Sequence, residues 1–189
     1  QSLGVEFYEG FEVEAIESVS LDRHLVKSVK GHSIECRVVL VCTNAWANDL
    51  LDTEDIKPAR GQVIVTSPIA TLPWRGLIHC DKGYIYVRTL GTRILIGGGR
   101  NVDFKNEETS VQESNEKITD YLREFIKDVL TDEQDFSIDY EWAGIMGMSE
   151  SRAPIVKEVS GGLYCGIRLG GMGLALSAEV ANQLSELVL

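Results

Sequence analysis

Four glycines lie close together near the end of the sequence, where a short apolar strand runs into a helical pattern: Gly166, Gly170, Gly171 and Gly173. Because glycine has no Cβ, the backbone here can adopt positive φ angles and come close to a bound group. From about Met172 the spacing is helical, with an apolar face formed by Leu176, Val180, Ala181, Leu184, Leu187 and Val188. The free N–H groups of that helix would point at whatever the turn holds, such as a polarised oxygen or a ring edge. The alternative is a tight strand-to-helix connection without a ligand.

No side chains suited to hydrolysis or metal binding accompany this turn. The histidines are scattered, and we expect surface or strand positions for them rather than catalytic roles: His24, His32 and His79. The cysteines lie far apart without a C-x-x-C pair: Cys36, Cys42, Cys80 and Cys165. We interpret them as free thiols of a reducing, cytoplasmic compartment, with disulfides or metal ligands as the alternative. No metal site is expected.

Composition narrows the class of protein. The chain has 189 residues, 44% of them apolar, which is enough for a packed core of one or two domains. No apolar run approaches the length of a membrane span. The net charge is −11, and residues 101–141 alone hold 13 acidic and 4 basic side chains. This charge argues against nucleic acid or anionic membranes as partners, because both require a basic surface.

Residues 1–57 are expected to form short strands. The segments "VEFYEGFEVEAIESV" and "HLVKSVKGHSIECRVVLVCT" are rich in β-branched and aromatic residues, with a turn at Gly31. The apolar run Val38–Cys42 suits a parallel strand that is buried on both faces. Asn44 is then expected to cap a short helix over Ala45–Leu51.

Residues 58–160 are expected to form longer strands with one helix. The expected strands are Arg60–Thr66, Leu77–Cys80, Tyr84–Thr89, Arg93–Gly97 and Ser137–Ile145. Ser110 and Glu113 have the spacing of a capping box for a helix that extends to Leu130. In that helix we expect the sheet-facing residues to be Ile118, Leu122, Phe125 and Val129. Strands in meander order under one helix indicate an α+β layer.

Five segments, in order, resemble the FAD-dependent D-amino acid oxidase superfamily, which includes glycine oxidase and sarcosine oxidase. The segments are "VVLVCTNAWANDLL", "KPARGQVIVT", "GYIYVRTLGTRILIGGG", "EWAGIMGMSESRAPIV" and "GGMGLALSAEVAN". The resemblance implies an α+β fold in three parts. A remnant of an FAD-binding domain spans residues 1–57, a mixed or antiparallel substrate domain spans 58–160, and a strand-turn-helix over 161–189 returns to the FAD domain.

Members of the superfamily begin with a G-x-G-x-x-G turn that holds the FAD pyrophosphate. This sequence has none, since neither Gly97-Gly98-Gly99 nor Gly171-Met172-Gly173 is followed by the further glycine that the motif requires. We therefore interpret the chain as a C-terminal portion of a larger flavoenzyme. The resemblance implies contact with the adenine near Val13 and with the dinucleotide at Thr43, Asn44 and Trp46. The flavin ring would contact Gly170, Gly171, Met172, Gly173 and Leu174.

The resemblance also implies the substrate residues. Relatives that oxidise amino acids bind the substrate carboxylate with a tyrosine and an arginine. Tyr84 matches the tyrosine, with Tyr86, two residues on, as the alternative. The position of the arginine is occupied by Met146. Methionine cannot bind a carboxylate, so either the substrate lacks one or another arginine replaces it: Arg88, Arg152 or Arg168. No cysteine follows the W-A-G segment closely, which indicates non-covalent FAD. The expected reaction is hydride transfer from a small amine or amino acid to flavin, with a hydroxy acid or polyol phosphate as the alternative substrate. The isolated chain is expected to be inactive.

Overall fold

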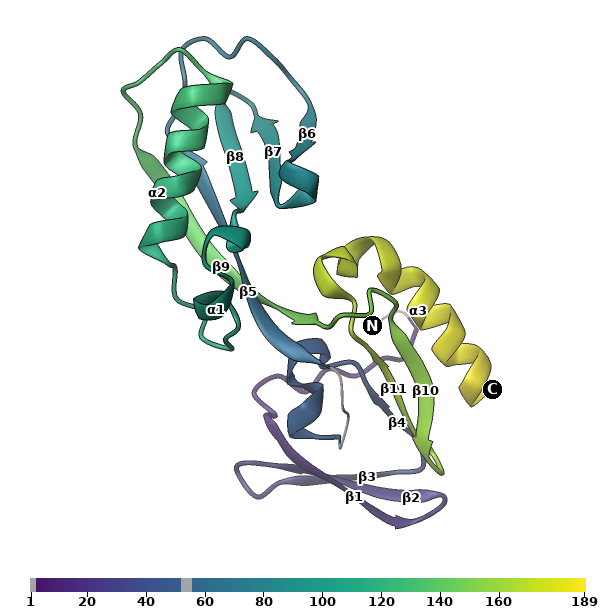
Figure 1. Ribbon diagram of the computed structural model, residues 1–189. Helices are drawn as coiled ribbons and strands as arrows, with labels where there is room; N and C mark the ends of the chain where they lie inside the picture. Colours follow the sequence, from purple (N-terminus) through teal and green to yellow (C-terminus); the bar gives the residue numbers. More distant parts are fainter. Residues whose placement is uncertain (1–2, 52–55) are drawn as a thin grey trace. The chain divides into compact units, whose positions relative to one another are not determined.

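A computed structural model describes residues 3–51 and 56–189. The chain forms two compact units (Figure 1). The first consists of the residues up to Ile56 together with Gly147–Leu189, and the second is Lys57–Met146. The change of unit after Ile56 lies beside the boundary expected from the sequence. The second change comes earlier than residue 160, because the strand at 155–160 pairs within the first unit.

The second unit contains a five-stranded sheet. Its strands are β5 (Lys57–Thr66), β6 (Leu77–Cys80), β7 (Ile85–Leu90), β8 (Arg93–Gly98) and β9 (Ile138–Met148, which extends into the first unit), in the order β6-β7-β8-β5-β9. The pairings of β6 with β7, β7 with β8 and β5 with β8 are all antiparallel. The expected hairpin is confirmed, with Gly91 at φ 63° in its turn. Short helical turns are η2 (Asp81–Gly83), η3 (Arg100–Val102) and α1 (Phe104–Glu107).

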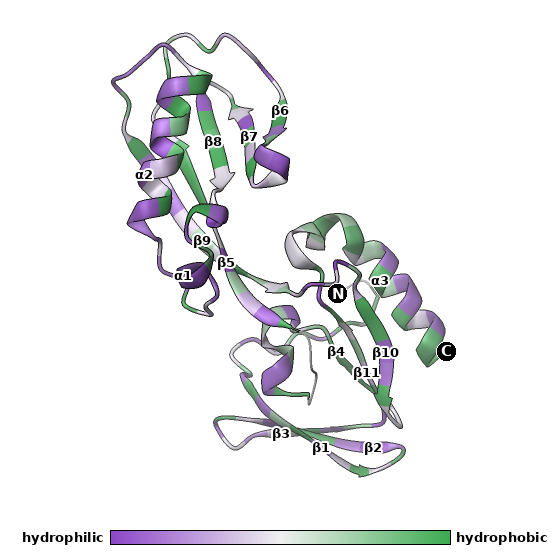
Figure 2. Ribbon diagram, viewed as in Figure 1, coloured by the Kyte–Doolittle hydropathy of each residue, from purple (hydrophilic) through white to green (hydrophobic). Residues whose placement is uncertain are grey.

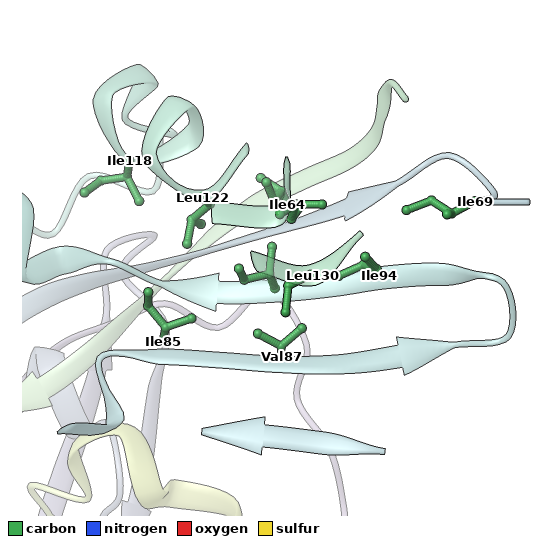
Figure 3. Close-up of a cluster of buried hydrophobic side chains, with 10 residues drawn as sticks. Ile64, Ile69, Ile85, Val87, Ile94, Ile118, Leu122 and Leu130 are labelled. Atoms are coloured by element: carbon green, nitrogen blue, oxygen red, sulfur yellow. The ribbon is translucent and has the colours of Figure 1, made fainter. Parts of the chain in front are cut away.

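Helix α2 (Glu116–Phe125) covers one face of this sheet and continues as a π-helical turn, η4 (Ile126–Leu130). Ile118 and Leu122 point toward the strands, where Ile64, Ile85, Val87 and Ile94 complete an apolar core (Figure 3). The strand β8 is mostly hydrophobic, whereas α2 alternates between hydrophilic and hydrophobic residues (Figure 2).

Two details of the expected helix are wrong. Val129 is 62% exposed, and Ile126 and Leu130 are buried in its place. The π-helical turn adds residues per turn, so the buried face shifts away from the regular 3.6-residue spacing. Phe125 is partly buried and packs against the core. The capping pair at Ser110 and Glu113 is also wrong, because the N-cap is Asn115, whose Oδ1 accepts the Lys117 N–H at 3.0 Å.

A buried ion pair explains the late start of α2. The Arg60 guanidinium donates to both carboxylate oxygens of Glu107, at 3.0 and 2.7 Å, and to the Glu113 carbonyl at 2.7 Å. Asn115 Nδ2 donates to Glu107 Oε1 at 2.7 Å. A guanidinium fork held by a carboxylate and backbone carbonyls keeps the segment before Asn115 out of a helix. This arginine belongs to the "KPARGQ" segment, and its role here is structural.

The first unit contains two three-stranded sheets. One is antiparallel, in the order β1 (Val13–Ser20), β2 (Arg23–Ser28), β3 (Ser33–Cys36). The other has the order β10 (Ile155–Ser160), β11 (Leu163–Ile167), β4 (Val39–Val41), with β11 and β4 parallel. A 3-10 helix, η1 (Asn44–Asp49), follows β4, and η5 (Gly170–Met172) leads into α3 (Gly173–Val188). Val5–Glu12 lies outside β1, so the first expected strand is shorter than its sequence pattern.

Strand β4 is buried on one of its two faces. Val41 is buried with Cys165 and Ile167, whereas Leu40 is 46% exposed. The expectation that Val38–Cys42 is buried on both faces is therefore wrong in this chain. Helix α3 buries Val180 and Leu184 against β11, where a Cβ on Gly166 would lie 2.6 Å from Leu184 Cδ1. The fold is thus α+β, as expected. Within the described residues, no helix is both long and apolar enough to cross a membrane.

Candidate functional site

The glycine turn connects β11 to α3 through an unusual backbone path. Arg168 has φ 63° and Gly170 has φ 56°, both in the left-handed region. A Cβ on Gly170 would lie 3.6 Å from Met148 Sδ, which is ordinary contact. Gly170 is therefore required by its backbone angle rather than by lack of space, because left-handed angles strain other residues.

Gly173 has no such explanation within the described residues. It begins α3 with helical angles, φ −52° and ψ −45°, and a Cβ there would have no neighbour closer than Leu169 Cβ at 3.9 Å. Glycine destabilises a helix by roughly 0.5–1 kcal/mol relative to alanine. The packing of the described chain therefore leaves room for a side chain at position 173, where its own fold does not need a glycine.

The first turn of α3 is also available to a ligand. Its N-cap, Met172, makes no side-chain hydrogen bond, and no acidic residue occupies the first turn. The first N–H groups of a helix have no partner inside it, and the dipole makes that end positive. Leu174 is 97% exposed beside this end. Room at Gly173, the N–H groups of an uncapped first turn and an exposed apolar side chain together fit a planar, electron-rich ring such as a flavin.

The turn at Thr43–Trp46 lies against the glycine turn. Asn44 was expected to cap the following helix, but the N-cap is Thr43, and no side-chain cap bond forms. Asn44 instead has φ 50°, and its Oδ1 accepts the Leu169 N–H at 3.1 Å. Trp46 is 41% exposed. The structure therefore brings Asn44 of the predicted cofactor residues to the glycine turn. Val13 begins β1, opposite Ser28, in the other sheet of this unit.

The two candidate tyrosines lie in the second unit in different surroundings. Ile85 and Val87 of β7 are buried toward α2, so Tyr86 between them lies on the opposite face of the sheet. There its ring covers Gly97, whose missing Cβ leaves it room, and burial raises the pKa of Tyr86. Tyr84 precedes β7, and its ring packs edge-on against Phe104, with 5.7 Å between centroids.

Met146 and the three candidate arginines are held in different ways. The Met146 side chain lies against Gly61, where a Cβ would be 2.9 Å from Met146 Cε. Arg88 and Arg152 are exposed. The Arg168 Nε donates to the Ala153 carbonyl at 2.8 Å, so this guanidinium joins the glycine turn to the loop that follows β9. The substrate roles of these residues stay predictions.

Sequence reasoning missed the contacts that hold the glycine turn. The sequence does carry one local signal, because asparagine, the residue at position 44, adopts left-handed angles more readily than most residues other than glycine. Its partner, Leu169, is 125 residues away, so no local pattern identifies the bond.

Comparison with known proteins defines the class. The family model described as FAD dependent oxidoreductase (DAO) matches residues 1–187. The chain therefore belongs to this family, which is named for its FAD cofactor. No curated protein matches the sequence significantly.

Solved structures share the fold. L-proline dehydrogenase from P. horikoshii aligns with a TM-score of 0.80 and 21% identity, over 99% of this chain and 51% of its own. Glycine oxidase from Geobacillus kaustophilus aligns with a TM-score of 0.81 and 20% identity, over 99% of this chain and 50% of its own. L-amino acid deaminase from Proteus vulgaris, lacking its specific insertion sequence, aligns with a TM-score of 0.73 and 20% identity, over 99% of this chain and 47% of its own. The chain thus spans about half the length of these structures.

Proposed function

We propose that the protein that carries this chain oxidises a small amine or amino acid by hydride transfer to a non-covalent FAD. The observation that carries the proposal is the room at Gly173, where a Cβ would meet only Leu169 Cβ at 3.9 Å, at the N-terminal end of α3, which has no side-chain cap bond. A ring edge that occupies this space would contact the backbone more closely than any side chain would allow. Family membership supports FAD as the occupant. The solved structures that share the fold include glycine oxidase, L-proline dehydrogenase and L-amino acid deaminase, which supports an amine or amino acid substrate.

The residues of the chain would serve this reaction by orientation and charge. FAD supplies the hydride acceptor when it is bound. The N–H groups at the start of α3 would stabilise negative charge that develops on the ring, an effect of about 0.3–1 kcal/mol at an exposed helix end and more in a buried one. Tyr84 or Tyr86 would donate a hydrogen bond to the substrate. No protein nucleophile is needed.

Met146 supports a second candidate substrate. Its thioether lies against Gly61, and it offers no charge to a carboxylate. A polyol phosphate, which has no carboxylate, is therefore an alternative, as is a hydroxy acid whose carboxylate is bound by other residues. An amine without a carboxylate would also suit this position.

A substrate panel tests the proposal. The FAD-loaded protein is mixed anaerobically with amines and amino acids in one series and with hydroxy acids and polyol phosphates in another. Loss of the flavin absorbance with an amine or amino acid is the expected result. Bleaching by the second series alone would favour the alternative, and a protein that binds no FAD would refute both.

A further inference from the structure

Three segments of the first unit meet at the side chain of Asn44. The first is its own turn after β4, where the residue has φ 50°. The second is the glycine turn, where the Leu169 N–H donates to Asn44 Oδ1 at 3.1 Å. The third is the end of β9, where Gly147 faces the same oxygen. Asn44 is half-buried between them.

Gly147 leaves room for this arrangement. A Cβ at that position would lie 2.8 Å from Asn44 Oδ1 and 3.2 Å from the Ala45 nitrogen. Both distances are shorter than ordinary carbon contacts, and the Ala45 nitrogen belongs to the backbone. The end of β9 therefore approaches the turn closely enough to confine the Asn44 amide.

The Leu169 peptide lies where the backbone of the glycine turn changes direction. It lies between Arg168 at φ 63° and Gly170 at φ 56°, so the chain changes direction on both sides of it. Asn44 binds its N–H, and Arg168 Nε binds the Ala153 carbonyl at 2.8 Å. A rotation of this peptide would move Gly170 and the start of α3 together, because η5 and α3 follow without a break.

We propose that Asn44 is a positioning residue for the glycine turn: its amide oxygen fixes the Leu169 peptide, and through it the backbone that would face the flavin. A glycine at this position could adopt the same left-handed angle but has no side chain to accept this hydrogen bond. The flavin part of the inference rests on the proposed function.

Two variants of Asn44 separate its left-handed backbone angle from its hydrogen-bond acceptor, and a third variant is a control. Asn44→Gly keeps the left-handed angle and loses the acceptor. Asn44→Asp keeps an acceptor oxygen and tolerates the angle. Asn48→Ala is the matched control, because Asn48 in the same η1 helix donates to the Ile56 carbonyl at 2.8 Å.

The first measurement is hydrogen–deuterium exchange of the peptide that contains Leu169, in the FAD-free protein. Asn44→Gly should speed exchange there roughly three- to tenfold, as expected for the loss of one hydrogen bond. Asn44→Asp should restore protection, and Asn48→Ala should leave this peptide unchanged. Unchanged exchange in Asn44→Gly would overturn the proposal.

The second measurement is FAD affinity and the flavin absorbance spectrum of the same variants. Asn44→Gly should weaken FAD binding by a factor similar to its effect on exchange and shift the spectrum, whereas Asn48→Ala should do neither. Faster exchange with unchanged affinity and spectrum would reduce Asn44 to a purely structural role and overturn the inference. If the full-length wild-type protein binds no FAD, the proposed function fails, whereas the exchange measurement on the FAD-free protein still decides whether Asn44 fixes the Leu169 peptide.

Discussion

At the scale of single residues, two glycines of the first unit are present for different reasons. Gly166 lies under α3, and a Cβ there would come within 2.6 Å of Leu184 Cδ1 and 2.9 Å of Val180 Cγ1. At Gly173 a Cβ would make only an ordinary contact with Leu169 Cβ, at 3.9 Å. The first glycine serves the fold, and the second is available to a ligand.

Substitution at these two positions should therefore separate stability from cofactor binding. Gly173→Val should leave the thermal unfolding temperature almost unchanged and abolish yellow colour in the FAD-loaded preparation. Gly166→Ala should lower the free energy of unfolding by about 1–3 kcal/mol through overpacking. Calorimetry and FAD titration of both variants provide the comparison. Full FAD content and full rate in Gly173→Val would reduce the glycine turn to a structural connection.

The candidate tyrosine provides a second prediction at this scale. Tyr84→Phe removes a hydroxyl but keeps the ring that packs against Phe104. Flavin content should therefore stay the same, while kcat/KM falls roughly tenfold or more if the hydroxyl binds a charged substrate group. Steady-state kinetics beside an absorbance spectrum gives both quantities. Tyr86→Phe is the matched variant, and a larger loss there than in Tyr84→Phe would transfer the substrate role to Tyr86.

At the scale of elements, the sequence predicted those parts that local pattern determines. Alternating apolar residues and Gly91 were sufficient for the hairpin of β7 and β8, because strand period and turn chemistry are local properties. The start of α2 was missed, since it depends on Arg60, which binds Glu107 and the Glu113 carbonyl from a distant strand. Likewise, the bond from Leu169 to Asn44 joins residues that no sequence period relates.

The π-helical turn at the end of α2 gives a testable contrast between neighbouring apolar residues. Ile126 is fully buried, whereas Val129 is 62% exposed. Ile126→Ala should cost about 2–5 kcal/mol of unfolding free energy through the cavity that it leaves. Val129→Ala should change stability by only about 0.5 kcal/mol or less, as surface substitutions do. Denaturant unfolding of both variants measures the difference. Equal costs would mean that a regular helix, with Val129 in the core, extends to Leu130.

At the scale of the whole molecule, the residues predicted to contact the cofactor and most of those predicted to bind the substrate lie in different units. The glycine turn and Asn44 belong to the first unit, and the tyrosines and Met146 belong to the second. The 189 residues contain no G-x-G-x-x-G segment, which is the usual holder of a dinucleotide pyrophosphate. The parts that would contact the ring and the substrate are thus present without that motif.

Two packed units without a G-x-G-x-x-G segment predict how the 189 residues behave when they are expressed alone. The chain should fold, because each unit has its own buried apolar core. It should nevertheless purify without colour, bind FAD weakly and show no oxidase activity, since without a G-x-G-x-x-G turn the pyrophosphate of FAD stays largely unbound. Isothermal titration calorimetry with FAD tests this, and free flavin without the nucleotide is the control ligand. Similar weak binding of FAD and free flavin is the expected result. Micromolar or tighter binding of FAD alone would show that these residues hold the dinucleotide without a G-x-G-x-x-G turn.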